Sequence, residues 1–204
     1  PDEPRHDRRS GRWNMARDQY GSFTPMSGYP SAGRLIDAVR SHEATIGVLA
    51  IPERKEKTPW WPHLATQAEG TPRIITRLPF IGSPGDRGPN DQALVICPVE
   101  PEPTGQDRTY LVVETSDEIG LDRLATACKQ AQMEAKFTSV WVDPETPSRY
   151  LHLAEVEGFI SDDDSKILRL SECLEGAASS IMTIGSYGLP LSNEQLETNK
   201  QTKD

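Results

Sequence analysis

The sequence has little that could support disulfide bonds, a metal site or a membrane span. Its three cysteines, Cys97, Cys128 and Cys173, lie far apart and form no Cys-x-x-Cys or Cys/His spacing, so we expect buried thiols and no bound metal. No apolar run approaches the roughly 20 residues that cross a bilayer, and no basic segment followed by an apolar core opens the chain. We therefore expect a cytoplasmic protein without a membrane partner.

Positive charge is also scarce. The 204 residues include 22 Lys and Arg against 31 Asp and Glu, which gives a formal net charge of -9. Proteins that bind nucleic acid draw on clustered positive charge, so we expect no nucleic-acid partner. Neither a Gly-x-Ser-x-Gly motif nor a phosphate-binding loop is present, because "GSPGDRG" does not lie between a strand and a helix. We predict no cofactor.

Proline and glycine, in contrast, are plentiful and unevenly placed. They cluster in "IGSPGDRGPND" and in "CPVEPEPTGQD", and the second cluster marks a predicted domain boundary near residues 98–107. Before it, Ser31 is the predicted N-cap of a helix with apolar residues on one face. The order of this helix and the strands predicts an α/β domain with at least partly parallel pairing. The predicted strands are "TIGVLAI", "PRIITRLPF" and "QALVICPV".

After the boundary, the periodicity predicts the order βαββαβ over residues 107–188. The two central strands flank "PETP", whose prolines favour a hairpin and an antiparallel pair. The second helix has Ser161 as its predicted N-cap, Asp164 in the capping-box position and Gly176 as its stop. This order is the ferredoxin-like arrangement, an antiparallel sheet with two helices on one face. The predicted elements are "RTYLVVET", "SDEIGLDRLATACKQAQ", "AKFTSVWVD", "SRYLHLAEVEGF", "SDDDSKILRLSECLEG" and "SSIMTIGSYG".

Two stretches of the first domain raise a choice between a catalytic and a structural role. Glu53 follows an apolar strand, at the place where open α/β sheets build ligand crevices, but its charged neighbours are typical of a solvated turn, and we favour a structural role. In "PWWPHL", Trp60 and Trp61 would form a stacking wall for a planar ligand with His63 as proton carrier, or else a proline-bounded aromatic plug. We favour the plug.

The order of these motifs resembles the prephenate dehydratase family, in which a two-lobed, periplasmic-binding-like catalytic part precedes an ACT regulatory domain. More closely, residues 12–53, "PWWPHL" and "PRIITRLPF" are similar to the region after the helical mutase domain in alphaproteobacterial proteins of the chorismate mutase family. The similarity extends over residues 12–190. It implies a small dehydratase-like α/β domain over 12–98 and an ACT-like domain over 107–190, before a polar tail, 191–204, that we expect to be disordered.

The dehydratase motifs of the family are altered in this chain. The Gly-Pro-x-Gly-Thr motif is not found, the Pro-Ile-Glu-Asn strand end appears only as "AIPE", and "NDQAL" replaces the Thr-Arg-Phe motif with its catalytic threonine. We therefore expect no catalytic residues and a regulatory or assembly role in phenylalanine biosynthesis. The alternatives are a stand-alone amino-acid sensor and a divergent prephenate dehydratase that uses Glu53, His63 or Thr76.

The resemblance also implies an effector site at an interface between two ACT-like modules. The family's Gly-Ala-Leu loop corresponds to Ile119-Gly120-Leu121, and its Glu-Ser-Arg-Pro strand to "WVDP". An aromatic amino acid would contact these three residues together with Val140 and Trp141, unless Trp141 fills the pocket. The segment "KFTSVWVD" is apolar and β-rich, and as an exposed edge strand it would tend to pair with another chain. We therefore expect a homodimer. The mutase helices would precede the first residue, and since the chain begins without Met, we expect a longer parent protein.

Overall fold

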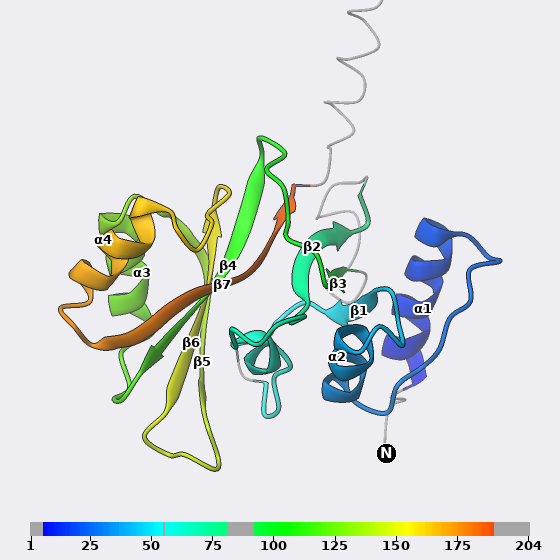
Figure 1. The fold of residues 1–204 in the computed structure, drawn as a ribbon, viewed down its shortest axis with the longest axis horizontal. Coiled ribbons are helices and arrows are strands. Elements are labelled where there is room, and N and C mark those ends of the chain that lie inside the picture. The colour runs from blue at the N-terminus through cyan, green and yellow to red at the C-terminus, as the bar shows by residue number, and fades with distance from the viewer. Residues whose placement is uncertain (1–5, 55, 81–91, 190–204) are drawn as a thin grey trace, which may run out of the picture.

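Seven strands form one curled sheet in the computed structural model, which describes residues 6–54, 56–80 and 92–189 (Figure 1). Across the sheet the strands lie in the order β1-β3-β2-β7-β4-β6-β5. None of the helices in these ranges is long and apolar enough to cross a membrane. The elements are α1 (His6–Tyr20), α2 (Ala32–Arg40), β1 (Gly47–Ala50), η1 (Trp61–Leu64), β2 (Arg73–Leu78), β3 (Ala93–Cys97), β4 (Asp107–Thr115), α3 (Leu121–Gln130), β5 (Ala135–Val142), β6 (Tyr150–Glu157), α4 (Ser165–Cys173) and β7 (Ala178–Gly188).

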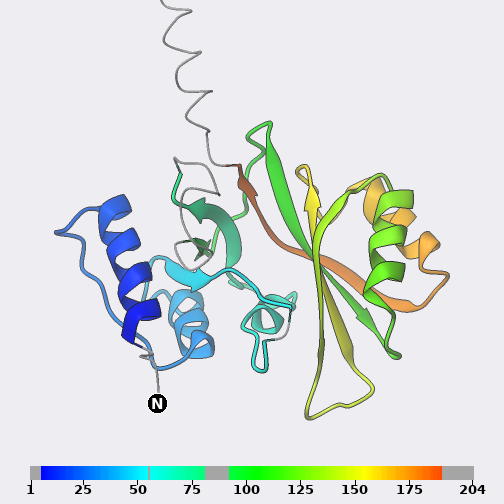
Figure 2. The same ribbon diagram turned by 180° about the vertical axis from the view of Figure 1, so that it is seen from behind.

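The C-terminal part of the sheet has the predicted βαββαβ order. Its strands lie in the order β7-β4-β6-β5, and each neighbouring pair is antiparallel. Both helices lie on the same side of these strands (Figure 2). α4 begins later than predicted, because its N-cap is Asp164, whose carboxylate accepts a hydrogen bond of 2.9 Å from the backbone N–H of Lys166. The prediction of Ser161 as the cap is wrong, and its hydroxyl donates to Asp163 instead.

The N-terminal strands pair differently from the prediction. β1, β3 and β2 form an antiparallel group, and among the described strands the only parallel contact joins β2 to β7 through one pair, Ile74 and Gly185. Gly185 has a φ of +132°, and a Cβ there would lie 2.2 Å from the backbone N and O of Ile74, so this approach requires glycine. β1 is an edge strand with an antiparallel neighbour, so the expectation that Glu53 lies where open α/β sheets build ligand crevices, at the carboxyl ends of parallel strands, is wrong.

The two N-terminal helices cover opposite faces of the β1-β3-β2 group. α2 begins as predicted at Ser31, whose hydroxyl accepts a hydrogen bond of 3.3 Å from the backbone N–H of Arg34, and its Ile36 packs in the main core cluster. α1 has no predicted counterpart, because its residues form no apolar stripe. Its Met15 packs against Val95 and other β2 and β3 side chains on the other face.

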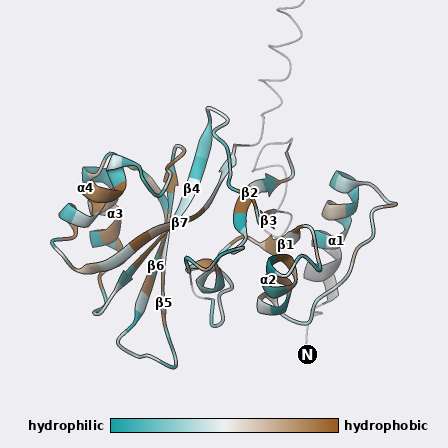
Figure 3. Ribbon diagram, in the orientation of Figure 1, coloured by the Kyte–Doolittle hydropathy of each residue, from teal (hydrophilic) through white to brown (hydrophobic). Residues whose placement is uncertain are grey.

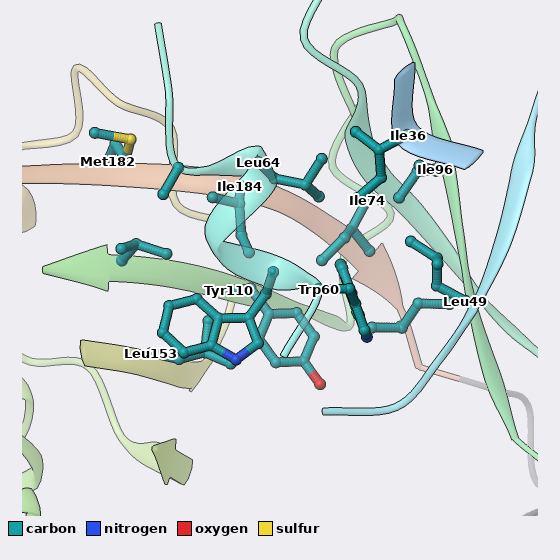
Figure 4. Close-up of a cluster of buried hydrophobic side chains, with 14 of the residues drawn as sticks. Ile36, Leu49, Trp60, Leu64, Ile74, Ile96, Tyr110, Leu153, Met182 and Ile184 are labelled. Carbon is teal, nitrogen blue, oxygen red and sulfur yellow. The ribbon is translucent and has the colours of Figure 1, made fainter. Parts of the chain in front are cut away.

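The main core cluster joins the two parts of the sheet around the tryptophan pair. Trp61 is fully buried, and the indole N–H of Trp60 donates to the carbonyl of Ala50 at 3.0 Å. Tyr110 and Leu153, from the C-terminal strands, lie in the same cluster (Figure 4), and the hydropathy colouring shows an apolar stretch in the middle of β7 (Figure 3). The interpretation of "PWWPHL" as an aromatic plug is thus confirmed.

The predicted domain boundary falls in the connection between β3 and β4. The segments before and after it share one sheet and the main core cluster. The division into domains at residues 98–107 therefore stays a prediction, as does the disorder of residues 191–204, which lie outside the described residues.

We expect Trp61→Ala to lower the free energy of unfolding by about 3 to 5 kcal/mol, because it removes a large, fully buried side chain and leaves a cavity between the two parts of the sheet. Urea unfolding followed by circular dichroism measures the effect. Trp13→Ala, at a side chain that is 40% exposed, is the matched control and should change stability by less than about 1 kcal/mol. Equal effects at the two positions would contradict the role of Trp61.

Candidate functional site

The predicted effector residues Ile119, Gly120 and Leu121 lie where the chain leaves β4 and enters α3. Ile119 is buried under the helices, Leu121 is half-buried and Gly120 is exposed. Gly120 is the N-cap of α3: its carbonyl accepts a hydrogen bond of 3.0 Å from the backbone N–H of Leu124, and no side chain caps the helix. A Cβ at Gly120 would meet no atom within 4 Å, so the space at this helix start is open.

Val140 and Trp141, the other predicted effector residues, lie on the edge strand β5, and both are half-buried. Val140 is in register with His152, and Trp141 with Leu151, on β6. Trp141 packs against the main core cluster, whereas Ile119 belongs to the cluster under α3 and α4. Within one chain, the fold thus turns Trp141 toward the sheet face opposite the one that carries Ile119.

A buried histidine lies beside this region. His152 is 0% exposed, and its Nε2 is 3.0 Å from the hydroxyl oxygen of Thr115. Because that hydroxyl donates its own proton to the carbonyl of Asp117, Nε2 carries the ring proton and Nδ1 is an acceptor. Nδ1 is buried and has no hydrogen-bond partner among the described residues. Burial lowers the pKa of His152 from 6.5 to about 4, so the ring is neutral at neutral pH.

The three residues named for a divergent dehydratase lie in different settings. Glu53 is exposed after β1, His63 is exposed in η1, and Thr76 is half-buried in β2 in register with Val95. In the part of the chain that the structure describes, no hydrogen bond or ion pair joins any two of them. General acid–base catalysis requires groups within hydrogen-bond reach, so the structure gives these residues no shared geometry.

The altered motif "NDQAL" is described only in part. Asn90 and Asp91 lie outside the described residues, and Gln92 directly precedes β3. Gln92 accepts a hydrogen bond from the guanidinium of Arg77 on β2. This hydrogen bond connects Gln92 to a polar cluster that lies between the two parts of the sheet.

The polar cluster brings together Arg77, Arg108, Glu155 and Tyr187 from four strands. Nη1 of Arg77 donates to the Tyr187 hydroxyl at 2.9 Å, and that hydroxyl donates to Oε1 of Glu155. Nη1 of Arg77 and Nη1 of Arg108 lie 3.9 Å and 3.8 Å from the same oxygen. Glu155 is only 6% exposed, and Tyr110 lies beside it, its ring centroid 6.1 Å from that of Tyr187. The cluster is a nearly buried junction between β2 and the C-terminal strands.

Electrostatics keep the two phenols of this cluster neutral. Burial, followed by the nearby Glu155 charge, raises the pKa of Tyr187 to about 12, and the same causes raise the pKa of Tyr110 well above its ordinary value. The guanidinium carbon of Arg77 lies 5.6 Å from the centroid of the Tyr187 ring, a favourable cation–π distance. The cluster can therefore hold charge, but it contains no activated nucleophile.

Reasoning from the sequence missed His152 and the residues of the polar cluster. Part of the signal is present, because "YLHLAEVE" places His152 and Glu155 in an otherwise apolar strand pattern, where polar residues need partners. The partners Arg77 and Arg108 are distant in sequence from Glu155. Nothing in the local pattern links them.

The chain has a prephenate dehydratase-like fold. The prephenate dehydratase from Arthrobacter aurescens, solved in complex with L-Phe, aligns with a TM-score of 0.58 over 99% of this chain and 96% of that chain, at 12% identity. The enzyme from Streptococcus mutans aligns with a TM-score of 0.55 over 87% and 91% of the two chains, also at 12% identity. GqqA, described as a novel type of quorum quenching acylase, aligns with a TM-score of 0.58 over 86% of this chain and 88% of that chain, at 15% identity. No protein-family model and no curated protein matches the sequence.

We expect His152 to make stability depend on pH below neutrality. The unfolded chain, with a histidine pKa of about 6.5, takes up a proton that the folded chain, with a pKa of about 4, does not. Stability from this residue is therefore present above pH 6.5 and is lost as the pH falls toward 4, by about 2 kcal/mol between pH 7 and pH 5. Urea unfolding across this range measures it.

His152→Gln should flatten the profile relative to the unmodified protein, although it also lowers stability at pH 7. His63→Gln, at an exposed histidine, is the control and should keep the full slope. An unchanged slope in His152→Gln would show that other groups cause the pH dependence.

Proposed function

We propose that residues 12–190 form a non-catalytic regulatory and assembly region of a protein of aromatic amino-acid biosynthesis whose parent enzyme is of the chorismate mutase type. Residues 107–190 would act as an ACT-like module that pairs with a second copy and binds an aromatic amino acid. Support comes from the sequence resemblance and from the fold likeness to prephenate dehydratases, one of them in complex with L-Phe.

The observation that carries the proposal is the open start of α3, a helix that packs against the edge strand β5. Backbone N–H groups at a helix N-terminus attract a carboxylate, and a Cβ at Gly120 would meet no atom within 4 Å. Trp141 packs into the core of its own chain, which argues against its filling an effector pocket. Val140 and the exposed Val142 remain at the edge, where a second copy would complete the site.

A catalytic role for the α/β segment has less support. Glu53 and His63 are exposed side chains, and catalytic carboxylates and imidazoles are usually held by partners in a cleft. The buried charges of the polar cluster are engaged with one another. The surroundings of these side chains favour a regulatory and assembly role over a catalytic one.

We expect L-phenylalanine to raise the melting temperature of the protein, because binding to the folded state alone stabilises it by mass action. A tenfold excess over the dissociation constant should raise the melting temperature by roughly 4 °C. Gly120→Val should abolish the shift by filling the open space at the helix start. Differential scanning fluorimetry measures both.

Gly28→Val is the matched control, since a Cβ at Gly28 also meets no atom within 4 Å, and it should keep the shift. If phenylalanine, tyrosine and tryptophan all leave the melting temperature unchanged, the effector role is contradicted and only the assembly role remains. Formation of phenylpyruvate from prephenate that depends on the protein and survives repurification would instead favour the divergent dehydratase.

We expect a homodimer, because β5 is a long edge strand with unpaired backbone groups. Light scattering at micromolar concentration should give twice the mass of one chain. Val142→Lys puts a charge on this edge at a side chain that is 41% exposed and should shift the protein toward the monomer. Leu168→Lys, at an exposed position of α4, should leave the mass unchanged. A monomeric mass for the unmodified protein would count against assembly through β5.

A further inference from the structure

The polar cluster has more positive than negative charge. Arg77 from β2 and Arg108 from β4 both face the carboxylate of Glu155 on β6. The other polar groups at the cluster are the amide of Gln92 and the neutral phenols of Tyr110 and Tyr187. Two guanidinium groups therefore share one carboxylate in a nearly buried place, although the chain as a whole has a net charge of -9.

The donors of Arg108 are poorly satisfied. Its Nη1 lies 3.8 Å from Oε1 of Glu155, which is an ion-pair distance and too long for a hydrogen bond. That oxygen already accepts the proton of Tyr187. Nε of Arg108 is buried and has no hydrogen-bond partner among the described residues, which is costly for a charged group.

Neighbouring carboxylates do not compensate Arg108. Glu157 is in register with Arg108 across β4 and β6, but one of its carboxylate oxygens lies 2.8 Å from Nζ of Lys136. The carboxylate of Asp107 accepts hydrogen bonds from the backbone N–H groups of Thr104 and Gly105. The excess positive charge at the cluster therefore has no acidic partner among these neighbours.

We propose that Arg108 and Arg77 form a binding site for a small monocarboxylate anion. A carboxylate matches the planar fork of a guanidinium, and it would accept from the terminal nitrogens of Arg108 while Arg77 adds a second charge. Arg77 is held for this by its hydrogen bond to Tyr187. The side chain of Arg108 is 25% exposed, so an anion in solution can reach it. Glu155 competes with the ligand from within the fold.

This site is independent of the proposed effector site. The cluster lies at the junction of β2 with the C-terminal strands, whereas Ile119 and Gly120 lie at the start of α3. Binding at one can fail without affecting the other, and the variants used to test them are different.

The test follows the side-chain Nε–H resonance of Arg108 by nitrogen-15 NMR while sodium acetate is added at pH 7.5. Sodium chloride at matched ionic strength is the reference, because screening alone weakens exposed ion pairs. We expect a saturable shift of the Arg108 resonance with acetate and none with chloride. A shift that does not saturate, or that is equal in chloride, would overturn the proposal.

Variants separate ligand binding from a purely structural ion pair. Arg108→Lys keeps the charge but removes the fork, and it should lose saturable acetate binding, read from the resonances of the Arg77 side chain. Glu155→Gln removes the internal competitor and should tighten acetate binding by roughly tenfold. Arg149→Gln, at an arginine paired with Glu114 and Asp143, is the control and should bind acetate normally. Unchanged or weaker binding in Glu155→Gln would contradict the site.

Discussion

The packing of Trp60 and Trp61 against the C-terminal strands is the interaction on which the rest of the structure depends. The backbone connects β2 and β7 through only one register pair, and a hydrogen bond contributes about 1 kcal/mol net. A buried tryptophan removes roughly 150 to 250 Å² from water, equivalent to about 4 to 6 kcal/mol. The indole packing, and not strand pairing, therefore holds the N-terminal segment in place.

This packing also decides where a ligand can reach the C-terminal strands. Two helices cover one face of these strands, and η1 with its tryptophans covers the other. The β5 edge, the exposed Gly120 at the start of α3 and the partly exposed Arg108 at the polar cluster are accessible. The first of these sites lies at an edge of the sheet, whereas the polar cluster joins the interior strands β2, β7, β4 and β6.

The sequence predicts the C-terminal part of the fold well and the N-terminal part less well. The strands and helices from β4 to β7 have clear periodicities that depend on local residues. The direction of β1 relative to its neighbour depends on β3, which lies far along the chain, so local pattern could not reveal it. α1 packs through few side chains, such as Met15, and it has no apolar stripe from which the sequence could predict the helix. Of the candidate sites, the loop at Gly120 is visible in the sequence by resemblance. That Nδ1 of His152 lacks a hydrogen-bond partner within the described part of the chain is a property of the folded geometry alone.

The polar cluster is hard to explain by stability. Moving charges out of water costs several kcal/mol per ion in proteins, and apolar residues of similar volume are often as stabilising as a buried ion pair. The hydrogen bonds of Tyr187 with Arg77 and Glu155 offset part of this cost. Arg108 gains least, since its Nε has no hydrogen-bond partner among the described residues. A second positive charge that adds little to the fold is better explained by what it can bind than by what it holds together.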